Sequence, residues 1–122
     1  LPDLALKGTF HMDEGFYYFR DLGDKVLLGG GRNLDKAGET TTEACVTPLV
    51  QQALENLLRS TILPDRQFTV ERRWSGVMSF RSAGGPPLVE RISPHLVVAA
   101  GLGGIGVAIG IRVARQAAAL IS

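Results

Sequence analysis

The sequence predicts an α+β fold, in which an antiparallel sheet with one packed helix is followed by a C-terminal strand–turn–helix. Three observations predict it. Short aromatic and β-prone segments, separated by turn residues, occupy the N-terminal part of the chain. One segment near the middle carries apolar residues at helical spacing. The last segment joins an apolar strand to a glycine-rich turn and a second helix.

The N-terminal part of the chain is typical of a strand followed by a β-hairpin. Partial alternation over residues 7–12 predicts the strand. The hairpin arms are FYYFRD at 16–21 and KVLL at 25–28, with a turn at Leu22-Gly23. The second arm runs into Gly29-Gly30-Gly31, where we expect a bend, a bulge or a close approach of the backbone to another group.

A single helix is expected near the middle of the chain. It follows a polar, turn-rich loop over 32–44, and Thr47-Pro48 supplies an N-cap residue and a proline at the first helical position. The helix is therefore predicted over 48–60, ending before Pro64. Its apolar stripe consists of Val50, Ala53, Leu54, Leu57 and Leu58.

Three strands and a second helix are expected in the C-terminal part. Residues 68–78 alternate with period two and carry large side chains on both faces, which predicts a long strand. A short strand at 88–92, a turn at 93–95 and a buried strand at 96–100 follow. The GLGGIG turn then leads into a helix from about Gly104 to the end.

The composition excludes several classes of function. A chain of 122 residues with 45% hydrophobic content can bury a core, as one ordinary domain or as part of a larger one. The net charge of +1 and the interspersed charges provide no basic face, so no nucleic-acid partner is expected. His11 and His95 lack a third ligand at suitable spacing, so no metal site is expected.

The single cysteine bears on the cellular compartment of the protein. The N-terminal residues bear on whether the chain is part of a longer one. Cys45 excludes an internal disulfide framework, favours a reducing, cytoplasmic compartment, and is expected to be a small buried residue. The start, LPDLALKG, has no signal-peptide pattern and no initiator methionine. We therefore expect a piece of a longer chain.

The run LVVAAGLGGIGVAIGI at 96–111 is open to several interpretations. Its sixteen residues are fewer than the ~20 that cross a bilayer, so no membrane span is expected. Gly101, Gly103 and Gly106 match G-x-G-x-x-G between a strand and a helix. A dinucleotide site, however, also needs a further strand and an acidic residue ~20 positions on, and the sequence stops at Ser122.

Two further interpretations of this run stay open from the residues alone. A glycine turn that leads into a helix exposes backbone N–H groups at the positive end of the helix dipole, where they can meet the carbonyl edge of a planar ring. The glycines can equally serve only to let the helix pack closely against a sheet.

Three segments, taken together, resemble a known family. They are FYYFRDLGDKVLLGGGRNLD, RRWSGVM and PPLVERISPHLVVAAGLGGIGVAIG. In this order they resemble the C-terminal portion of the D-amino-acid-oxidase-like FAD-dependent oxidoreductases, the glycine and sarcosine oxidase group. The resemblance covers nearly the whole chain. It implies that 1–92, with the antiparallel sheet and the helix at 48–60, belong to a substrate domain, and that 93–122 form the C-terminal element of an FAD-binding domain.

The resemblance also implies a cofactor, a reaction and a partner. FAD would be bound non-covalently, because Cys45 is not where the sarcosine oxidases attach their flavin. A small amine or amino-acid-like substrate would be oxidised by hydride transfer to the flavin. A missing N-terminal FAD-binding portion would hold the pyrophosphate, so this piece alone would be inactive and bind FAD poorly. Backbone contacts to the flavin would come from Gly101, Leu102, Gly103, Gly104, Ile105, Gly106 and Val107.

The chain departs from the family pattern at one substrate position. Met78, in WSGVMSF, stands where the amino-acid oxidases carry an arginine for the substrate carboxylate, and methionine cannot make that contact. Arg72, Arg73 or Arg81 would have to replace it. Strand arginines more commonly pair with acids such as Glu71.

The remaining candidate residues each have a structural alternative. Tyr17, Trp74 and Met78 are the candidate substrate contacts, but for Trp74 a role as a core anchor is the favoured expectation. The aromatic residues at 17–19 alternate across a sheet and can divide between core and surface. No catalytic acid or base can be identified. The alternative function is a non-catalytic α+β binding or assembly module whose glycine-rich helix packs on a partner chain, and exposed apolar surface could also support a homo-oligomer.

Overall fold

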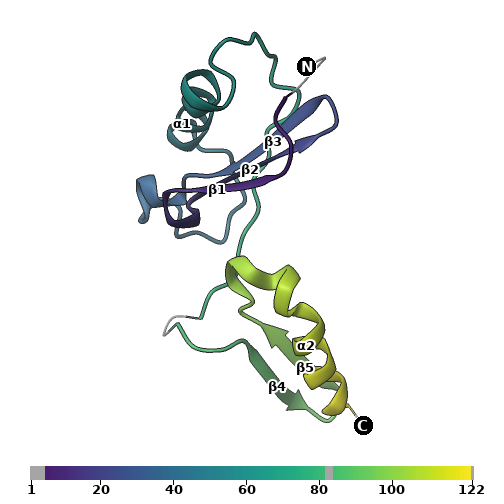
Figure 1. Cartoon of the computed structure of the whole chain (residues 1–122). Coiled ribbons are helices and arrows are strands. Elements are labelled where there is room, and N and C mark those ends of the chain that lie inside the picture. Colours follow the sequence, from purple (N-terminus) through teal and green to yellow (C-terminus); the bar gives the residue numbers. More distant parts are fainter. Residues whose placement is uncertain (1–4, 82–83, 122) are drawn as a thin grey trace. The chain divides into compact units, whose positions relative to one another are not determined.

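The computed structural model describes residues 5–81 and 84–121, and its fold is α+β with two antiparallel sheets and two helices (Figure 1). The chain divides into two units, Leu1–Gly76 and Val77–Ser122. Each unit holds one of the sheets and one of the helices. The predicted domain boundary after residue 92 concerns membership in the whole protein and stays a prediction.

The first unit contains a three-stranded antiparallel sheet in the order β1-β2-β3. The strands are β1 (Thr9–Met12), β2 (Tyr17–Leu22) and β3 (Lys25–Gly30), which confirms the predicted strand and hairpin. Phe19 pairs with Phe10 across the sheet and is buried, and the two rings stack with centroids 4.9 Å apart. This aromatic pair forms part of the core of the first unit.

The glycines at the end of β3 allow a close approach of two backbones, as the sequence predicts. Gly30 has a φ of +120°, and a Cβ added there would collide with the carbonyl oxygen of Phe16. The N–H of Gly31 donates to that same oxygen at 2.9 Å. A side chain at position 30 would therefore separate the strands where they are hydrogen-bonded.

The helix of the first unit is α1 (Pro48–Leu57), which continues as a π-helical turn over Leu58–Ile62. The predicted helix at 48–60 is therefore confirmed. Thr47 is the N-cap residue, but its hydroxyl donates to Glu39 Oε1 at 2.8 Å instead of capping the helix. The helix contacts β3, and the side chain of Val50 lies against Gly31 at the end of that strand.

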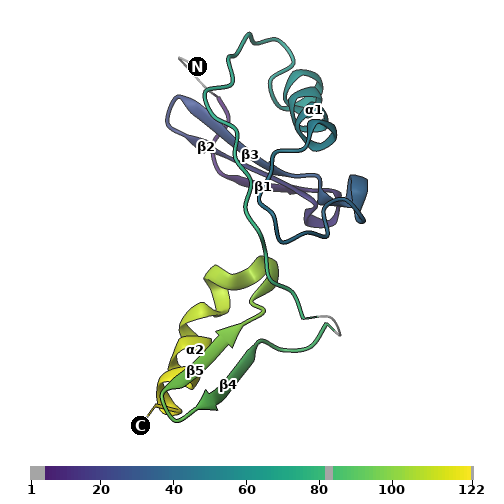
Figure 2. The ribbon, with the colours of Figure 1, turned by 180° about the vertical axis from the view of Figure 1, so that it is seen from behind.

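The predicted long strand over 68–78 is wrong. None of these residues belongs to a strand, and no ladder of backbone hydrogen bonds joins them to any other described residue. The segment passes beside β3 (Figure 2). Lys25 Nζ of that strand lies 2.9 Å from Glu71 Oε2 of the segment. Alternation predicts an extended backbone, but a strand also needs a hydrogen-bonded neighbour. Here side chains alone attach the segment to the sheet.

The expected burial of Cys45 is also wrong. Cys45 is exposed, and it lies in the irregular connection that precedes α1. A small apolar residue is buried only where the surrounding chain packs over it. In the described structure the neighbouring residues 41–46 are all exposed, so this connection provides no such cover.

The second unit consists of a β-hairpin and a helix that lies across one face of it (Figure 2). Strands β4 (Leu88–Ser93) and β5 (Leu96–Ala100) pair antiparallel, with an irregularity between Arg91 and Ser93. A short 3-10 turn over Gly103–Ile105 precedes α2 (Gly106–Ala119).

Two details of the second unit differ from the sequence-based expectation. The α-helix begins at Gly106 rather than near Gly104, because the preceding residues form the 3-10 turn. The strand expected to be buried is only partly covered, since Leu96 is 50% exposed. Val113 of α2, which is buried, is the core residue of this unit.

Replacing Gly30 by alanine should destabilise the first unit. The strained backbone and the collision with the Phe16 carbonyl group together predict a loss of about 2–4 kcal/mol in the free energy of unfolding. Urea denaturation measures this loss. Gly76→Ala is the control, because a Cβ there meets nothing within 4 Å. An unchanged midpoint for Gly30→Ala would show that the two backbones do not approach as described.

Candidate functional site

The connection between β5 and α2 is the glycine turn, Gly101–Val107, and its backbone conformation requires glycine at two positions. Gly101 has a φ of +76° and Gly103 a φ of +58°. Both values lie in the left-handed region, which other residues adopt only with strain. These two glycines allow the chain to leave the strand and enter the helix within a few residues.

The segment Ser79–Arg81 packs directly on the glycine turn. The N–H of Gly103 donates to the carbonyl oxygen of Ser79 at 2.9 Å. A Cβ at Gly103 would lie 3.2 Å from the ring of Phe80, and one at Gly101 would lie 3.0 Å from Cγ of Arg81. Close packing on protein therefore accounts for Gly101 and Gly103, although the contact is between the turn and the segment Ser79–Arg81 and not the predicted one between the helix and a sheet.

Gly104 differs from these two glycines. Its φ is outside the left-handed range, and a Cβ added there would meet nothing within 4 Å. Two apolar residues that follow it in the turn are also uncovered, because Ile105 is 63% exposed and Val107 is fully exposed. Neither backbone strain nor packing among the described residues explains a glycine at position 104. The turn thus presents bare main chain at Gly104, followed by two exposed apolar side chains.

The electrostatic surroundings of the turn favour a ligand with an electron-rich edge. The N-terminus of α2 has no side-chain cap and no acidic residue in its first turn. Uncapped N–H groups at a helix N-terminus carry partial positive charge. Arg81 adds a cation that lies along Gly101 and donates from Nη1 to the carbonyl oxygen of Pro86 at 3.2 Å.

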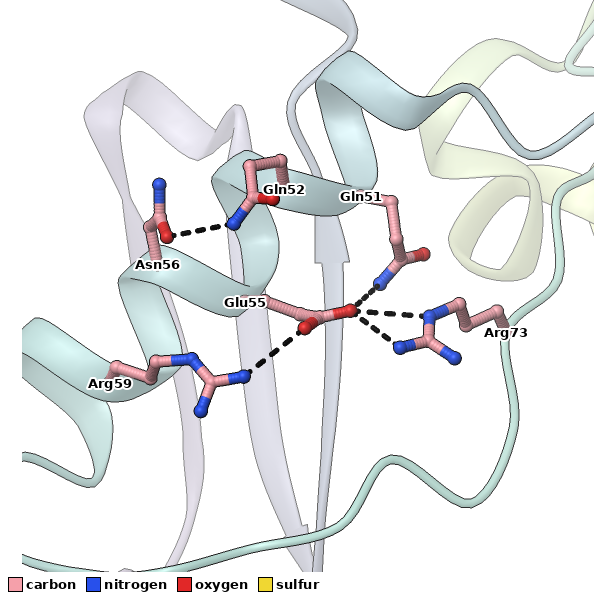
Figure 3. Close-up of polar contacts among 6 residues, drawn as sticks. All are labelled: Gln51, Gln52, Glu55, Asn56, Arg59 and Arg73. Carbon is pink, nitrogen blue, oxygen red and sulfur yellow. Dashed lines mark hydrogen bonds and ion pairs between the residues drawn. The ribbon is translucent and has the colours of Figure 1, made fainter.

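In the first unit, the Glu55 carboxylate of α1 attaches the segment 68–78 to the helix. This segment contains Trp74 and belongs to no strand. Glu55 accepts hydrogen bonds from Arg73, at 2.6 Å from Nη2 and 3.2 Å from Nε, and from Arg59 Nη2 at 3.3 Å (Figure 3). The expected pairing of a strand arginine with Glu71 is therefore corrected: Arg73 pairs with Glu55, and Glu71 pairs with Lys25. Arg73 is engaged within its own unit.

The predicted substrate contacts divide between the two units. Tyr17 is half-buried in β2, and Trp74 lies in the segment 68–78; both belong to the first unit. No ring contact, hydrogen bond or ion pair joins these two residues in the described structure. Trp74 is 64% exposed, so the expectation that it is a core anchor is wrong for the described chain.

Met78 and the glycine turn belong together to the second unit. Met78 is 46% exposed and directly precedes Ser79, which binds Gly103. Sequence reasoning missed the contacts of Ser79 and Phe80 with the turn. About twenty residues separate them from it along the chain, and nothing in the spacing signals a contact across that distance.

Within 5–81 and 84–121, no group of three or more His, Cys, Asp or Glu side chains is placed to bind a metal ion. In the same part of the chain, neither helix combines the length and the apolar character that crossing a bilayer requires.

Comparison with known proteins gives a family match that covers nearly the whole chain. The family model for FAD-dependent oxidoreductases, DAO, matches residues 2–120. No curated protein and no solved structure gives a significant match.

The Glu55 contacts should make the stability of the first unit depend on pH. The hydrogen bond from Arg73 lowers the pKa of Glu55 below its ordinary value near 4.5. The stabilisation is therefore fully present above the pKa of the unfolded chain and is lost as the pH falls through the lower, folded value. Glu55→Gln should be less stable than the wild type at neutral pH, and this difference should shrink on acidification.

Urea midpoints across this pH range measure the effect. Gln52→Ala is the matched control on α1, because Gln52 donates only to Asn56 in this cluster (Figure 3). A difference between Glu55→Gln and the wild type that persists unchanged in acid would contradict the assigned ion pair.

Proposed function

The chain belongs to the family of FAD-dependent oxidoreductases, and we propose that it forms the C-terminal portion of an enzyme of the glycine and sarcosine oxidase group. When bound, FAD supplies the redox chemistry by accepting a hydride from the carbon next to an amine nitrogen. The family match over 2–120 supports the oxidoreductase class. The ordered motifs of the sequence support the finer assignment.

The observation that carries this proposal is the bare main chain at Gly104. A glycine is needed neither for the backbone conformation there nor for packing among the described residues. A planar ring that approaches the turn would meet main-chain atoms at Gly104 and apolar side chains at Ile105 and Val107, both of which are exposed. This combination of a bare backbone and flanking apolar groups fits the edge of a flavin.

The turn would contribute to the chemistry through its main-chain dipoles. Negative charge develops on the pyrimidine edge of a reduced flavin, and the uncapped N-terminus of α2 would stabilise it. A favourable helix-end contact of this kind contributes ~0.3–2 kcal/mol. Because these dipoles are fixed by the fold, they need no rearrangement when the charge appears. The remaining FAD contacts, above all to the diphosphate, would come from an N-terminal FAD-binding portion outside this chain.

The structure also bears on how an amino-acid-like substrate would be bound. Of the three arginines that could replace the arginine absent at Met78, Arg73 is engaged with Glu55. Arg81 lies against Gly101, in the same unit as the turn and Met78. We therefore assign the substrate carboxylate to Arg81, with Met78 of the same unit as a further candidate contact. A guanidinium group can bind a carboxylate through two hydrogen bonds.

Purified whole protein should carry non-covalent FAD, and a side chain at Gly104 should displace it. Gly104→Leu places a side chain where the ring would approach, so we expect FAD affinity to fall at least about tenfold, or ~1.4 kcal/mol. Gly85→Leu is the matched control, since Gly85 is also open and outside the left-handed range. Flavin absorbance per protein after gel filtration measures retention.

Two results would contradict this assignment. The first is a Gly104→Leu variant that keeps its flavin at the same level as Gly85→Leu, which would place the ring elsewhere. The second is a whole protein that contains no flavin after reconstitution with FAD, which would favour the non-catalytic assembly module. Thermal unfolding of both variants shows whether the fold is intact.

Loss of the Arg81 guanidinium should affect only substrates that carry a carboxylate. With Arg81→Gln, we expect kcat/KM for a small amino acid to fall about 10- to 100-fold, the ~1.5–3 kcal/mol of a hydrogen bond to a charged group. The value for the matching amine without the carboxylate should change little. Steady-state kinetics with the two substrates, at equal flavin content, makes the comparison. Equal losses for both would contradict a role in carboxylate binding.

A further inference from the structure

The helix α2 has two apolar faces, and the described structure covers only one of them. The inner face packs on β4 and β5, and its residue Val113 is 6% exposed. The second face is apolar as well but lies open. We call it the outer stripe, and it consists of Val107, Ile111, Ala114 and Ala118 of α2 and of Ile121 in the turn that directly follows the helix, all of them exposed.

The spacing of the outer stripe is that of one continuous helix face. Its members follow one another at intervals of four, three, four and three residues, which places them along a single line on a helix. At about 100° per residue, the inner face and the outer stripe together span roughly 200° of the helix circumference, whereas a surface helix needs an apolar stripe of about 100°. The apolar surface of α2 therefore suits a helix that is covered on two sides.

The size of the uncovered side chains supports a docking surface. Val107, Ile111 and Ile121 are 103%, 66% and 71% exposed. Ala114 and Ala118 lie between them and would let a rigid surface approach the helix closely. Helices that lie in a membrane interface instead carry large residues such as Trp, Phe and Leu on their apolar face. A folded polypeptide therefore fits the stripe better than a lipid surface.

The charges beside the stripe indicate the chemistry of the partner. The remaining arc of α2 carries Arg112 and Arg115, and the helix has no acidic residue. In the described structure no ion pair involves either arginine. A second copy of α2 placed across the stripe would bring only further arginines to this flank, which is unfavourable. A partner with carboxylates at the edge of its apolar surface is complementary.

We propose that the outer stripe of α2 is the docking surface for a folded polypeptide with an apolar centre and a carboxylate rim that faces Arg112 and Arg115. The stripe begins at Val107, the last residue of the glycine turn. A polypeptide seated there therefore borders the turn. We identify this polypeptide as the portion that binds the FAD diphosphate, and that identification rests on the proposed function. The existence of the docking surface does not rest on it.

Accessibility of a cysteine on each side of α2 in the whole protein tests this proposal. Ala114→Cys lies on the outer stripe and Ala108→Cys on the arginine side, and both alanines are exposed in the described structure. In a Cys45→Ser background, a maleimide should label position 114 at least about tenfold more slowly than position 108 in the native protein. The two rates should be equal in urea. Equal native rates would overturn the proposal.

Two further measurements identify the occupant if position 114 is protected. Protection that disappears on dilution, with a halving of the mass in sedimentation, would overturn the proposed partner in favour of a second copy. Protection that appears only with phosphatidylcholine–phosphatidylglycerol vesicles would overturn it in favour of a membrane. Ala114→Glu should weaken docking in the whole protein, and Ala108→Glu should not.

The outcomes also separate this proposal from the proposed function. Protection at 114 in a protein that binds no FAD would leave the docking surface standing and remove the flavin assignment. Bound FAD together with rapid labelling at position 114 would support the flavin assignment and overturn the docking surface.

Discussion

The second unit depends on a hydrogen bond from the N–H of Gly103 to the carbonyl oxygen of Ser79, 2.9 Å long. It fixes the glycine turn to the segment before β4, and side chains at Gly101 and Gly103 would be tightly packed there as well as strained in their backbone. The turn is thereby directed into α2 with its main chain exposed at Gly104. One side of the turn is thus bound to protein, and the other side is open to a ligand.

This division between a packed side and an open side extends along α2. The inner face of the helix contributes the buried Val113, while the outer stripe and the exposed Ile105 and Val107 extend the open side. An electron-rich ring at the turn and a polypeptide on the stripe would together cover these apolar groups. The fold therefore provides rigid main-chain dipoles beside an apolar surface, which is the environment in which electrostatic stabilisation is most effective.

Local sequence patterns are sufficient to predict most of the helices and strands. The features that they do not predict depend on contacts between residues distant in sequence. The β2–β3 hairpin and α1 follow from turn residues and helical spacing, which act over a few residues. The segment 68–78 was predicted as a strand because alternation indicates extension but does not show whether a neighbouring edge exists. The position of the glycine turn was predictable, but its contacts with Ser79 and Phe80 were not.

The measurement that most directly tests the central claim is an experimental structure of the whole protein with FAD. We expect the pyrimidine edge of the flavin to lie in van der Waals contact with the main chain at Gly104, at about 3.5–4 Å. The Gly103–Ser79 hydrogen bond should be retained in that complex. A flavin bound away from the turn, with Gly104 covered by protein side chains instead, would contradict this contact.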